Sequence, residues 1–166
     1  GLVSPDGKVF ITRGFLDKYY SGFVSADELV GVISHELGHL ALGHTKKRMV
    51  SYTLQNTLQM GLGLVLARVI PLIGSYISAM LLRLVTAKLS RIDEYEADKY
   101  ASALMIKTGL GTKPLIDLFS KLEKLTGNQY NELTWLQSHP NPKDRIDAIK
   151  KLADIWKNQT DMQVKN

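Results

Sequence analysis

The sequence predicts an α+β fold in which α-helices predominate. Apolar residues recur at helical spacing in several separate segments, whereas a turn sequence and a β-branched run stand near the amino terminus. The length of 166 residues, with 45% hydrophobic and 22% charged, suits one globular domain with a sizeable core. We therefore expect residues 1–166 to form a single domain.

The first elements are expected before residue 50. Pro5-Asp6-Gly7 is a turn sequence and the apolar run Val9–Thr12 follows it, which predicts a β-hairpin and hence a small amino-terminal sheet. Ser25 and Glu28 fit a capping box, and apolar residues follow at helical spacing. These signals predict a helix from about Ala26 to the late 40s.

Residues 49–89 are largely apolar, and we expect them to form a helical hairpin inserted into the domain. Pro71 and Gly74 indicate the bend between its two helices. A membrane-spanning helix needs about 20 predominantly apolar residues, and neither half meets this requirement cleanly. The hairpin is therefore expected to be buried in protein or in an oligomer, or to rest in a membrane interface with the basic run 46–48 against anionic headgroups. A two-pass span is the remaining alternative.

Three further helices with apolar stripes are predicted after Ser90. Glycines end the first two, and a proline-rich loop precedes the third. The glycines are Gly109 and Gly127, and the loop is SHPNPKDR at 138–145. The polar residues 160–166 are expected to form a frayed tail.

Composition limits the chemistry of this chain. It contains no cysteine, which excludes disulfides and thiolate metal sites, so any metal must bind to His, Asp or Glu. The net charge of +5 is moderate, and its basic residues are spread over several segments rather than gathered in one stripe. We expect no nucleic-acid partner. No signal-peptide pattern is visible in the first residues.

The segment SHELGHLALGH at 34–44 lies within the helix predicted from Ala26. On a helix of about 100° per residue, His35 and His39 share one face, one turn apart, so both imidazoles can reach a single ion. Glu36 falls beside them, where its carboxylate can contact a metal-bound water without being a ligand. This is the HExxH arrangement of zinc peptidases, with two histidine ligands and a glutamate base.

His44 is the third histidine of this segment. On a continuous helix it lies about 140° from His39 and about 180° from His35, so it would point away from the ion. The longer HExxHxxGxxH pattern needs a glycine and a histidine where this chain has Leu42 and Thr45. We therefore expect His44 to be a surface or helix-end residue.

The third ligand is expected to be an acid on another helix, because a catalytic zinc typically has three protein ligands and one position for water. The stretch EYEAD offers Glu94, Glu96 and Asp98. Glu94 and Asp98 share a helix face, whereas Glu96 lies about 200° from Glu94. We predict Glu94 as the ligand and Asp98 as the acceptor for the free ring N–H of a ligating histidine. The alternative is a solvated acidic helix start.

The proline-rich loop carries two more candidates. His139 would hydrogen-bond the oxyanion of a tetrahedral intermediate, or approach the metal as a fourth ligand that closes the site when no substrate is bound. Arg145 would orient that loop through its fork of donors. The plainer alternatives are that His139 is an ordinary loop residue and that Arg145 forms a surface salt bridge.

Four segments of the chain together resemble the HtpX and CAAX-prenyl-protease family of gluzincin zinc metallopeptidases. These segments are PDGKVFITRGFLD, DELVGVISHELGH, SRIDEYEAD and SHPNPKDRI. The resemblance covers nearly the whole chain. It implies one zinc ion on His35, His39 and Glu94, with Glu36 as base and Asp98 supporting a ligand.

In the same resemblance His139 and Arg145 match a late HP…R motif. CAAX processors are large multi-pass enzymes, and this chain lacks the necessary spans, which favours the bacterial, envelope-associated branch of the family.

The resemblance implies a zincin-like fold and a zinc metalloendopeptidase that hydrolyses unfolded or misassembled proteins in envelope or membrane quality control, membrane-associated or periplasmic. The run Val9–Thr12 is a candidate edge strand for holding an extended polypeptide. Residues 49–89 would meet a membrane surface or another copy of the chain. The alternatives are a zinc-bearing chaperone or assembly factor that rarely cuts, and a membrane-surface module whose His and Glu residues are coincidental.

Overall fold

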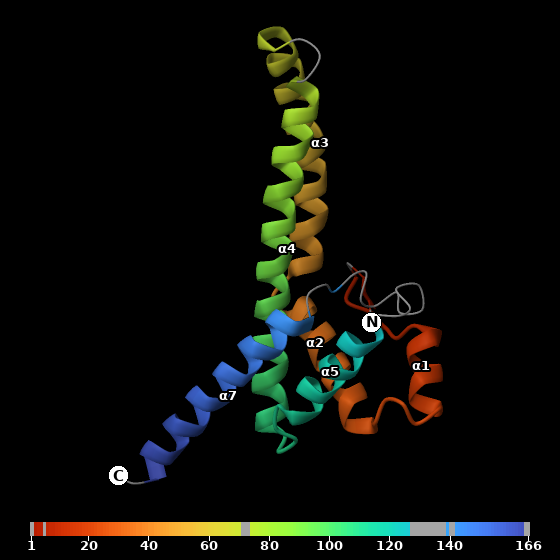
Figure 1. Cartoon of the computed structure of the whole chain (residues 1–166), viewed down its shortest axis with the longest axis vertical. Helices are drawn as coiled ribbons and strands as arrows, with labels where there is room; N and C mark the ends of the chain where they lie inside the picture. The colour runs from red at the N-terminus through yellow and green to blue at the C-terminus, as the bar shows by residue number, and fades with distance from the viewer. Residues whose placement is uncertain (1, 5, 71–73, 127–138, 140–141, 165–166) are drawn as a thin grey trace.

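The computed structural model describes residues 2–4, 6–70, 74–126, 139 and 142–164. Helices predominate, as the sequence predicts. The elements in chain order are β1 (Leu2–Val3), β2 (Val9–Phe10), α1 (Arg13–Tyr20), α2 (Ala26–Ala41), α3 (His44–Val69), α4 (Gly74–Lys107), α5 (Lys113–Thr126) and α7 (Pro142–Val164). In Figure 1 most elements gather toward one end of the molecule, from which α3 and the start of α4 extend together and α7 runs outward separately.

Two short strands lie at the amino terminus. β1 and β2 pair antiparallel with Val3 opposite Val9. The turn between them contains Gly7, whose φ of 88° lies in the left-handed region that glycine adopts without steric cost. Pro5, the first residue of the expected turn, lies outside the described residues. Each strand has two residues, so β2 stops before the expected Thr12.

Helix α1 is absent from the sequence-based prediction, which expects no helix before Ala26. Phe15 is 2% exposed and belongs to the core, and Tyr19, one helical turn later, packs against the same core. Together with Leu16 and Tyr20 this pair gives helical spacing over barely two turns, which is too short to distinguish a helix from a loop.

Helix α2 begins as predicted and ends earlier than predicted. Ser25 Oγ accepts a hydrogen bond from Glu28 N–H, and the Glu28 carboxylate accepts one from Ser25 N–H, so the capping box is confirmed. The helix ends at Ala41 rather than in the late 40s, because Gly43 adopts a left-handed conformation with φ 69°. The chain changes direction there and α3 starts at His44.

The core lies among α2, α4, α5 and α7, with α1 at its edge. It consists of Phe15, Val24, Val32, Ala101, Met105, Leu115, Leu118, Phe119, Leu122, Ile146 and Ile149. Within it α2 and α4 approach unusually closely: a Cβ on Gly38 would stand 2.9 Å from the backbone oxygen of Ala97 and 3.0 Å from its Cα. Glycine at 38 therefore brings the HELGH segment directly against the helix that carries EYEAD.

Helices α3 and α4 pack against one another along the projecting part of the molecule (Figure 1). α4 passes through Ser90 without a break, so part of the apolar segment and the whole acidic stretch 94–98 belong to one helix of 34 residues. At about 1.5 Å per residue this helix is roughly 50 Å long. Pro71, predicted at the bend, lies outside the described residues, and Gly74 is the first residue of α4.

Apolar side chains of this pair of helices are largely exposed, so they are not buried against the rest of the described chain. Those more than half exposed are Met49, Val50, Leu54, Met60, Leu64, Val65, Val69, Tyr76, Met80, Leu81 and Leu84. Among the helices that the structure describes, none has both the length and the apolar composition needed to cross a membrane.

Helix α7 continues to Val164, through residues that were expected to fray. The stretch 157–164 contains neither glycine nor proline, so nothing in its backbone chemistry ends the helix there. Residues 165 and 166, like Gly127 at the expected end of α5, lie outside the described part of the chain. The assignment of 1–166 to one domain stays a prediction.

Candidate metal centre

Helix α2 carries three polar side chains of the HELGH segment into the interior. His35, Glu36 and His39 are at most 4% exposed. The Nε2 atoms of the two histidines lie 3.0 Å apart. The structure therefore brings both rings to one point, as the helical spacing predicts.

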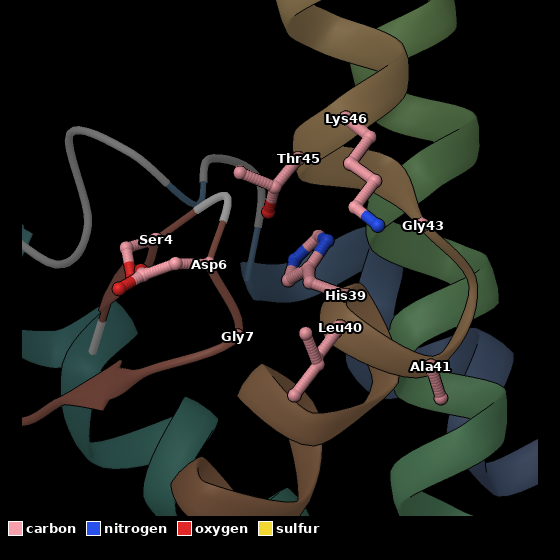
Figure 2. A pocket seen from close by; sticks show the side chains of 9 residues that line it. All are labelled: Ser4, Asp6, Gly7, His39, Leu40, Ala41, Gly43, Thr45 and Lys46. Atoms are coloured by element: carbon pink, nitrogen blue, oxygen red, sulfur yellow. The ribbon is translucent and has the colours of Figure 1, made fainter.

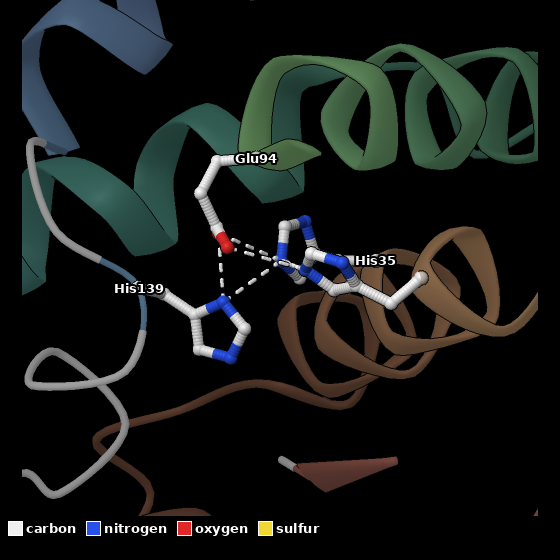
Figure 3. A group of neighbouring side chains, drawn as sticks. His35, Glu94 and His139 are labelled. Atoms are coloured by element: carbon white, nitrogen blue, oxygen red, sulfur yellow. Dashed lines mark hydrogen bonds and ion pairs between the residues drawn. The ribbon is translucent and has the colours of Figure 1, made fainter. Parts of the chain in front are cut away.

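Two further donors reach the same point from other parts of the chain. Glu94 on α4 has one carboxylate oxygen 3.3 Å from His35 Nε2 and the other 3.4 Å from His39 Nε2. His139, which lies shortly before α7, places Nδ1 2.7 Å from Glu94 Oε2 and 3.2 Å from His35 Nε2 (Figure 3). The four side chains offer ligand atoms that all lie within 4.8 Å of one another.

The spacing of these atoms fits a zinc ion. In a tetrahedral site with bonds of about 2.0–2.1 Å, ligand atoms stand about 3.3 Å apart. The distances given above range from 2.7 to 3.4 Å. Imidazole nitrogen and carboxylate oxygen are also donors that zinc accepts. The donor set therefore suits a metal held by His35, His39 and Glu94, with His139 in place to act as a fourth donor.

The ionisation of Glu94 and His39 favours metal binding. Burial acts to raise the pKa of Glu94, but hydrogen bonds from the three surrounding histidines hold it far below its ordinary value. Burial is also the main cause that lowers the pKa of His39. An ionised carboxylate and a neutral imidazole are the forms that bind a metal ion.

A buried ion pair supports His35 on its other nitrogen. Asp98 lies 2.8 Å from His35 Nδ1 and accepts two hydrogen bonds of 2.7 Å from the Arg145 guanidinium. Burial and the Arg145 charge act to lower the pKa of His35, but hydrogen bonds to Asp98 and Glu94 outweigh them and raise it. Asp98 thus lies where it can hold the His35 proton on Nδ1, which leaves Nε2 to face the cluster.

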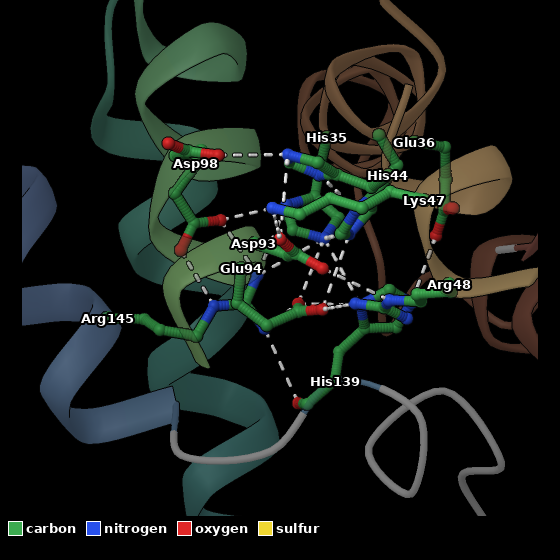
Figure 4. A network of polar contacts seen from close by, with 12 residues as sticks. His35, Glu36, His44, Lys47, Arg48, Asp93, Glu94, Asp98, His139 and Arg145 are labelled. Carbon is green, nitrogen blue, oxygen red and sulfur yellow. Dashed lines mark hydrogen bonds and ion pairs between the residues drawn. The ribbon is translucent and has the colours of Figure 1, made fainter. Parts of the chain in front are cut away.

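Arg145 is buried at 1% exposure, which excludes the surface salt bridge considered as its alternative. Its guanidinium lies over the Phe119 ring at 4.3 Å and donates a hydrogen bond to the backbone oxygen of His139 at 3.4 Å. The arginine therefore ties His139 to Asp98, as Figure 4 shows.

Glu36 lies beside the cluster and is not one of the four donors. Its Oε1 is 3.4 Å from His139 Nε2. Burial acts to raise the pKa of Glu36, but the hydrogen bond and the charge of His139 lower it to about 2. The carboxylate is therefore ionised at neutral pH, which is the form that a general base requires.

The expectation of a surface position for His44 is wrong. Because Gly43 turns the chain before His44, the ring folds back toward α2 and is only 2% exposed. Its Nδ1 lies 2.9 Å from His39 Nδ1, and its Nε2 lies 3.1 Å from Glu96 Oε2. Its place at the start of α3 agrees with the helix-end part of the expectation.

A group of charges beside the metal centre is also missing from the prediction. Asp93 is buried, with Lys47 Nζ at 3.3 Å and Arg48 Nε at 3.4 Å. Arg48 also reaches Glu94 at 3.2 Å (Figure 4). Two residues of the basic run 46–48 thus bind acids of α4, whereas the membrane-interface alternative placed this run against lipid headgroups. The sequence signal that could have indicated this group of charges is that Asp93 directly precedes the predicted ligand Glu94.

A pocket of about 460 Å³ opens beside His39 (Figure 2). It is lined by Ser4, Asp6, Gly7, His39, Leu40, Ala41, Gly43, Thr45 and Lys46. The turn between β1 and β2 forms one side, and the junction of α2 and α3 forms the other. A molecule bound there would contact a member of the metal centre.

Comparison with known proteins agrees with this geometry. The profile of peptidase family M48 matches residues 1–153. Metalloprotease LoiP of Escherichia coli (strain K12) is 30% identical over an alignment of 151 residues, and the match covers 89% of this chain and 59% of that protein. Metalloprotease YcaL of the same organism is 32% identical over an alignment of 146 residues, and the match covers 80% of this chain and 53% of that protein. The chain thus spans somewhat more than half the length of these relatives. No solved structure gives a significant match.

Proposed function

The chain belongs to peptidase family M48, and from this membership we propose that it is a zinc-dependent metalloendopeptidase with one ion per chain. The observation that supports the proposal most directly is the convergence of His35, His39 and Glu94 on one point, with Glu36 next to it. A surface module with coincidental histidines does not account for this buried arrangement.

The proposed reaction divides the chemistry between the ion and the protein. A bound zinc ion supplies a Lewis acid that polarises the scissile carbonyl and activates water near neutral pH. Glu36 takes the proton from the attacking water and returns it to the leaving amine. Asp98 and Arg145 keep His35 in the tautomer that presents Nε2 to the centre.

We propose unfolded or misassembled polypeptides in extended form as substrates. β2 pairs with β1 on one side, and its other edge pairs with no strand among the described residues. Such an edge can bind a peptide backbone with little preference for sequence. The pocket beside His39 adjoins the same hairpin and would receive a substrate side chain.

We further propose that the protein acts in quality control at the bacterial cell envelope, membrane-associated or periplasmic, with the helices α3 and α4 resting in a membrane interface. The exposed apolar side chains of these helices support a contact with lipid, because such a surface is costly in water. The relatives LoiP and YcaL are bacterial proteins, which supports the bacterial assignment.

A zinc-bearing chaperone or assembly factor is the second candidate, and His139 is the observation that favours it. Its Nδ1 lies within the group of ligand atoms, so four protein donors would surround the ion. A catalytic zinc keeps one position open, whereas a closed site is typical of a structural one. In this alternative the protein binds polypeptides and rarely cuts them.

The proposal is tested by metal content together with cleavage of an unfolded casein. The parent and Glu36→Gln should both hold about one zinc per chain, and the variant should cut at least about 100-fold more slowly, because it lacks the general base. Glu123→Gln, the same change at an exposed position on α5, should cut like the parent. A parent that holds zinc and does not cut would favour the chaperone, and His139→Ala would then show whether opening the site restores cleavage.

A further inference from the structure

The contact between His44 and His39 has no part in the proposed reaction, yet both rings are buried and directly adjoining. Their Nδ1 atoms are 2.9 Å apart, and their ring centroids are 5.1 Å apart. A hydrogen bond at this distance needs a proton on one nitrogen and a lone pair on the other. Which nitrogen carries the proton follows from the surroundings of each ring.

The surroundings of His39 place its proton on Nδ1. Its Nε2 faces the metal centre, 3.0 Å from His35 Nε2 and 3.4 Å from Glu94 Oε1. A histidine that binds a metal through Nε2 carries its remaining proton on Nδ1 and donates it to an acceptor outside the centre. That acceptor is Nδ1 of His44, which must present its lone pair.

The surroundings of His44 agree with this assignment. With its lone pair on Nδ1, a neutral His44 carries its proton on Nε2. That nitrogen lies 3.1 Å from Glu96 Oε2 and 3.9 Å from Asp93 Oδ1, both acceptors. Every donor in the series His39, His44 and Glu96 therefore has an acceptor, and no two lone pairs oppose one another.

The same assignment speaks against a second metal ion beside the first. His44, Asp93 and Glu96 offer atoms within 4.8 Å of one another. His44 has no lone pair left for an ion, however, and the ammonium group of Lys47 and the guanidinium of Arg48 already neutralise Asp93. The cluster is better explained as support for His39.

We propose that His44 is a positioning residue that holds His39 in its metal-binding tautomer and orientation, and that Glu96 holds His44 in turn. The inference rests on the proposed metal site. His35 receives the equivalent support from the Asp98 carboxylate, so the two histidine ligands are oriented by different acceptors, one charged and one a neutral imidazole.

A matched pair of variants separates the hydrogen bond from packing. His44→Asn and His44→Leu have side chains of similar size, but only asparagine places an acceptor oxygen near the position of the histidine Nδ1. Zinc affinity, measured by competition with a chelator, should fall about 10–100-fold in His44→Leu, the usual effect of removing such a partner. His44→Asn should recover most of this loss. Thermal unfolding of the metal-free proteins checks that both variants fold.

The outcomes distinguish this inference from the proposed function. Equal zinc affinities in the leucine and asparagine variants would overturn the positioning role alone, provided that the parent holds about one zinc. A parent without stoichiometric zinc would overturn the metal site and this inference with it.

Nuclear magnetic resonance of the zinc-loaded parent supplies an independent readout. Long-range ¹H–¹⁵N spectra should find His39 protonated on Nδ1 and His44 protonated on Nε2 alone. A proton on Nδ1 of His44 would contradict the proposed series of hydrogen bonds.

Discussion

Glu36 stays charged inside the protein because the electrostatic effect of His139 and His35 exceeds the cost of burial. A carboxyl group whose pKa is lowered by folding stabilises the folded state above its ordinary pKa. That contribution is lost as the pH falls through the folded-state value. For Glu36 the interval runs from 4.5 down to about 2.

The metal-free parent should therefore lose stability as the pH falls from 4.5 to about 2, and Glu36→Gln should lose less, because an amide does not titrate. Urea unfolding at several pH values in this interval measures the difference. Asp154→Asn, at an exposed position on α7, is the control and should keep the parental pH dependence. If Glu36→Gln also kept the parental pH dependence, the low pKa of Glu36 would make no contribution to the stability of the folded protein.

The contact between α2 and α4 positions the metal centre, because each helix supplies part of the ligand set. Gly38 makes the contact possible, since a Cβ at this position would stand 2.9 Å from the Ala97 backbone oxygen. Backbone atoms cannot give way as a flexible side chain can, so the helices themselves would have to separate.

Gly38→Ala should lower the free energy of unfolding by about 1–3 kcal/mol, the usual cost of overpacking, and should weaken zinc binding. Gly61→Ala on α3 is the matched control, because a Cβ there meets nothing within 4 Å. Alanine has a higher helix propensity than glycine, so the free energy of unfolding of this control should rise by up to about 1 kcal/mol. Urea unfolding measures both, and a stabilised Gly38→Ala would show that the close approach is not required.

The described surface of the whole molecule is uneven, with exposed apolar side chains concentrated on α3 and the start of α4. These two segments project together in Figure 1. Leu64 and Met80, one on each helix, are 72% and 60% exposed. Two occupants would remove this surface from water: a lipid interface, as proposed above, or another copy of the chain.

The double variant Leu64→Glu with Met80→Glu should lose most binding to anionic vesicles in co-sedimentation, because each charge must leave water to enter the interface. Asn56→Asp with Gln59→Glu adds the same charge at exposed residues of α3 that are already polar, and should bind nearly as the parent does. Equal binding by the parent and the double variant would contradict the lipid contact. Sedimentation velocity tests the alternative that another copy of the chain covers this surface. In that case the parent should self-associate and the double variant should not.

The sequence by itself determined the central pair of histidines and the neighbouring glutamate. Their relation is local to one helix, where a separation of four residues places two side chains on one face whatever the rest of the fold does. The same reasoning placed Glu94 and Asp98 on a shared face of α4, and the structure brings both to His35.

Only the tertiary structure decided where α2 ends, which acids the basic run 46–48 meets and how deeply Arg145 is buried. Periodicity describes one continuous helix, so it cannot show that a left-handed Gly43 turns His44 back onto His39. Likewise it cannot show which faces of distant helices meet, because that depends on packing throughout the core. Periodicity therefore places side chains that are related within one helix. It could not place His44 or the partners of Lys47 and Arg48, where a turn or a contact between helices sets the geometry.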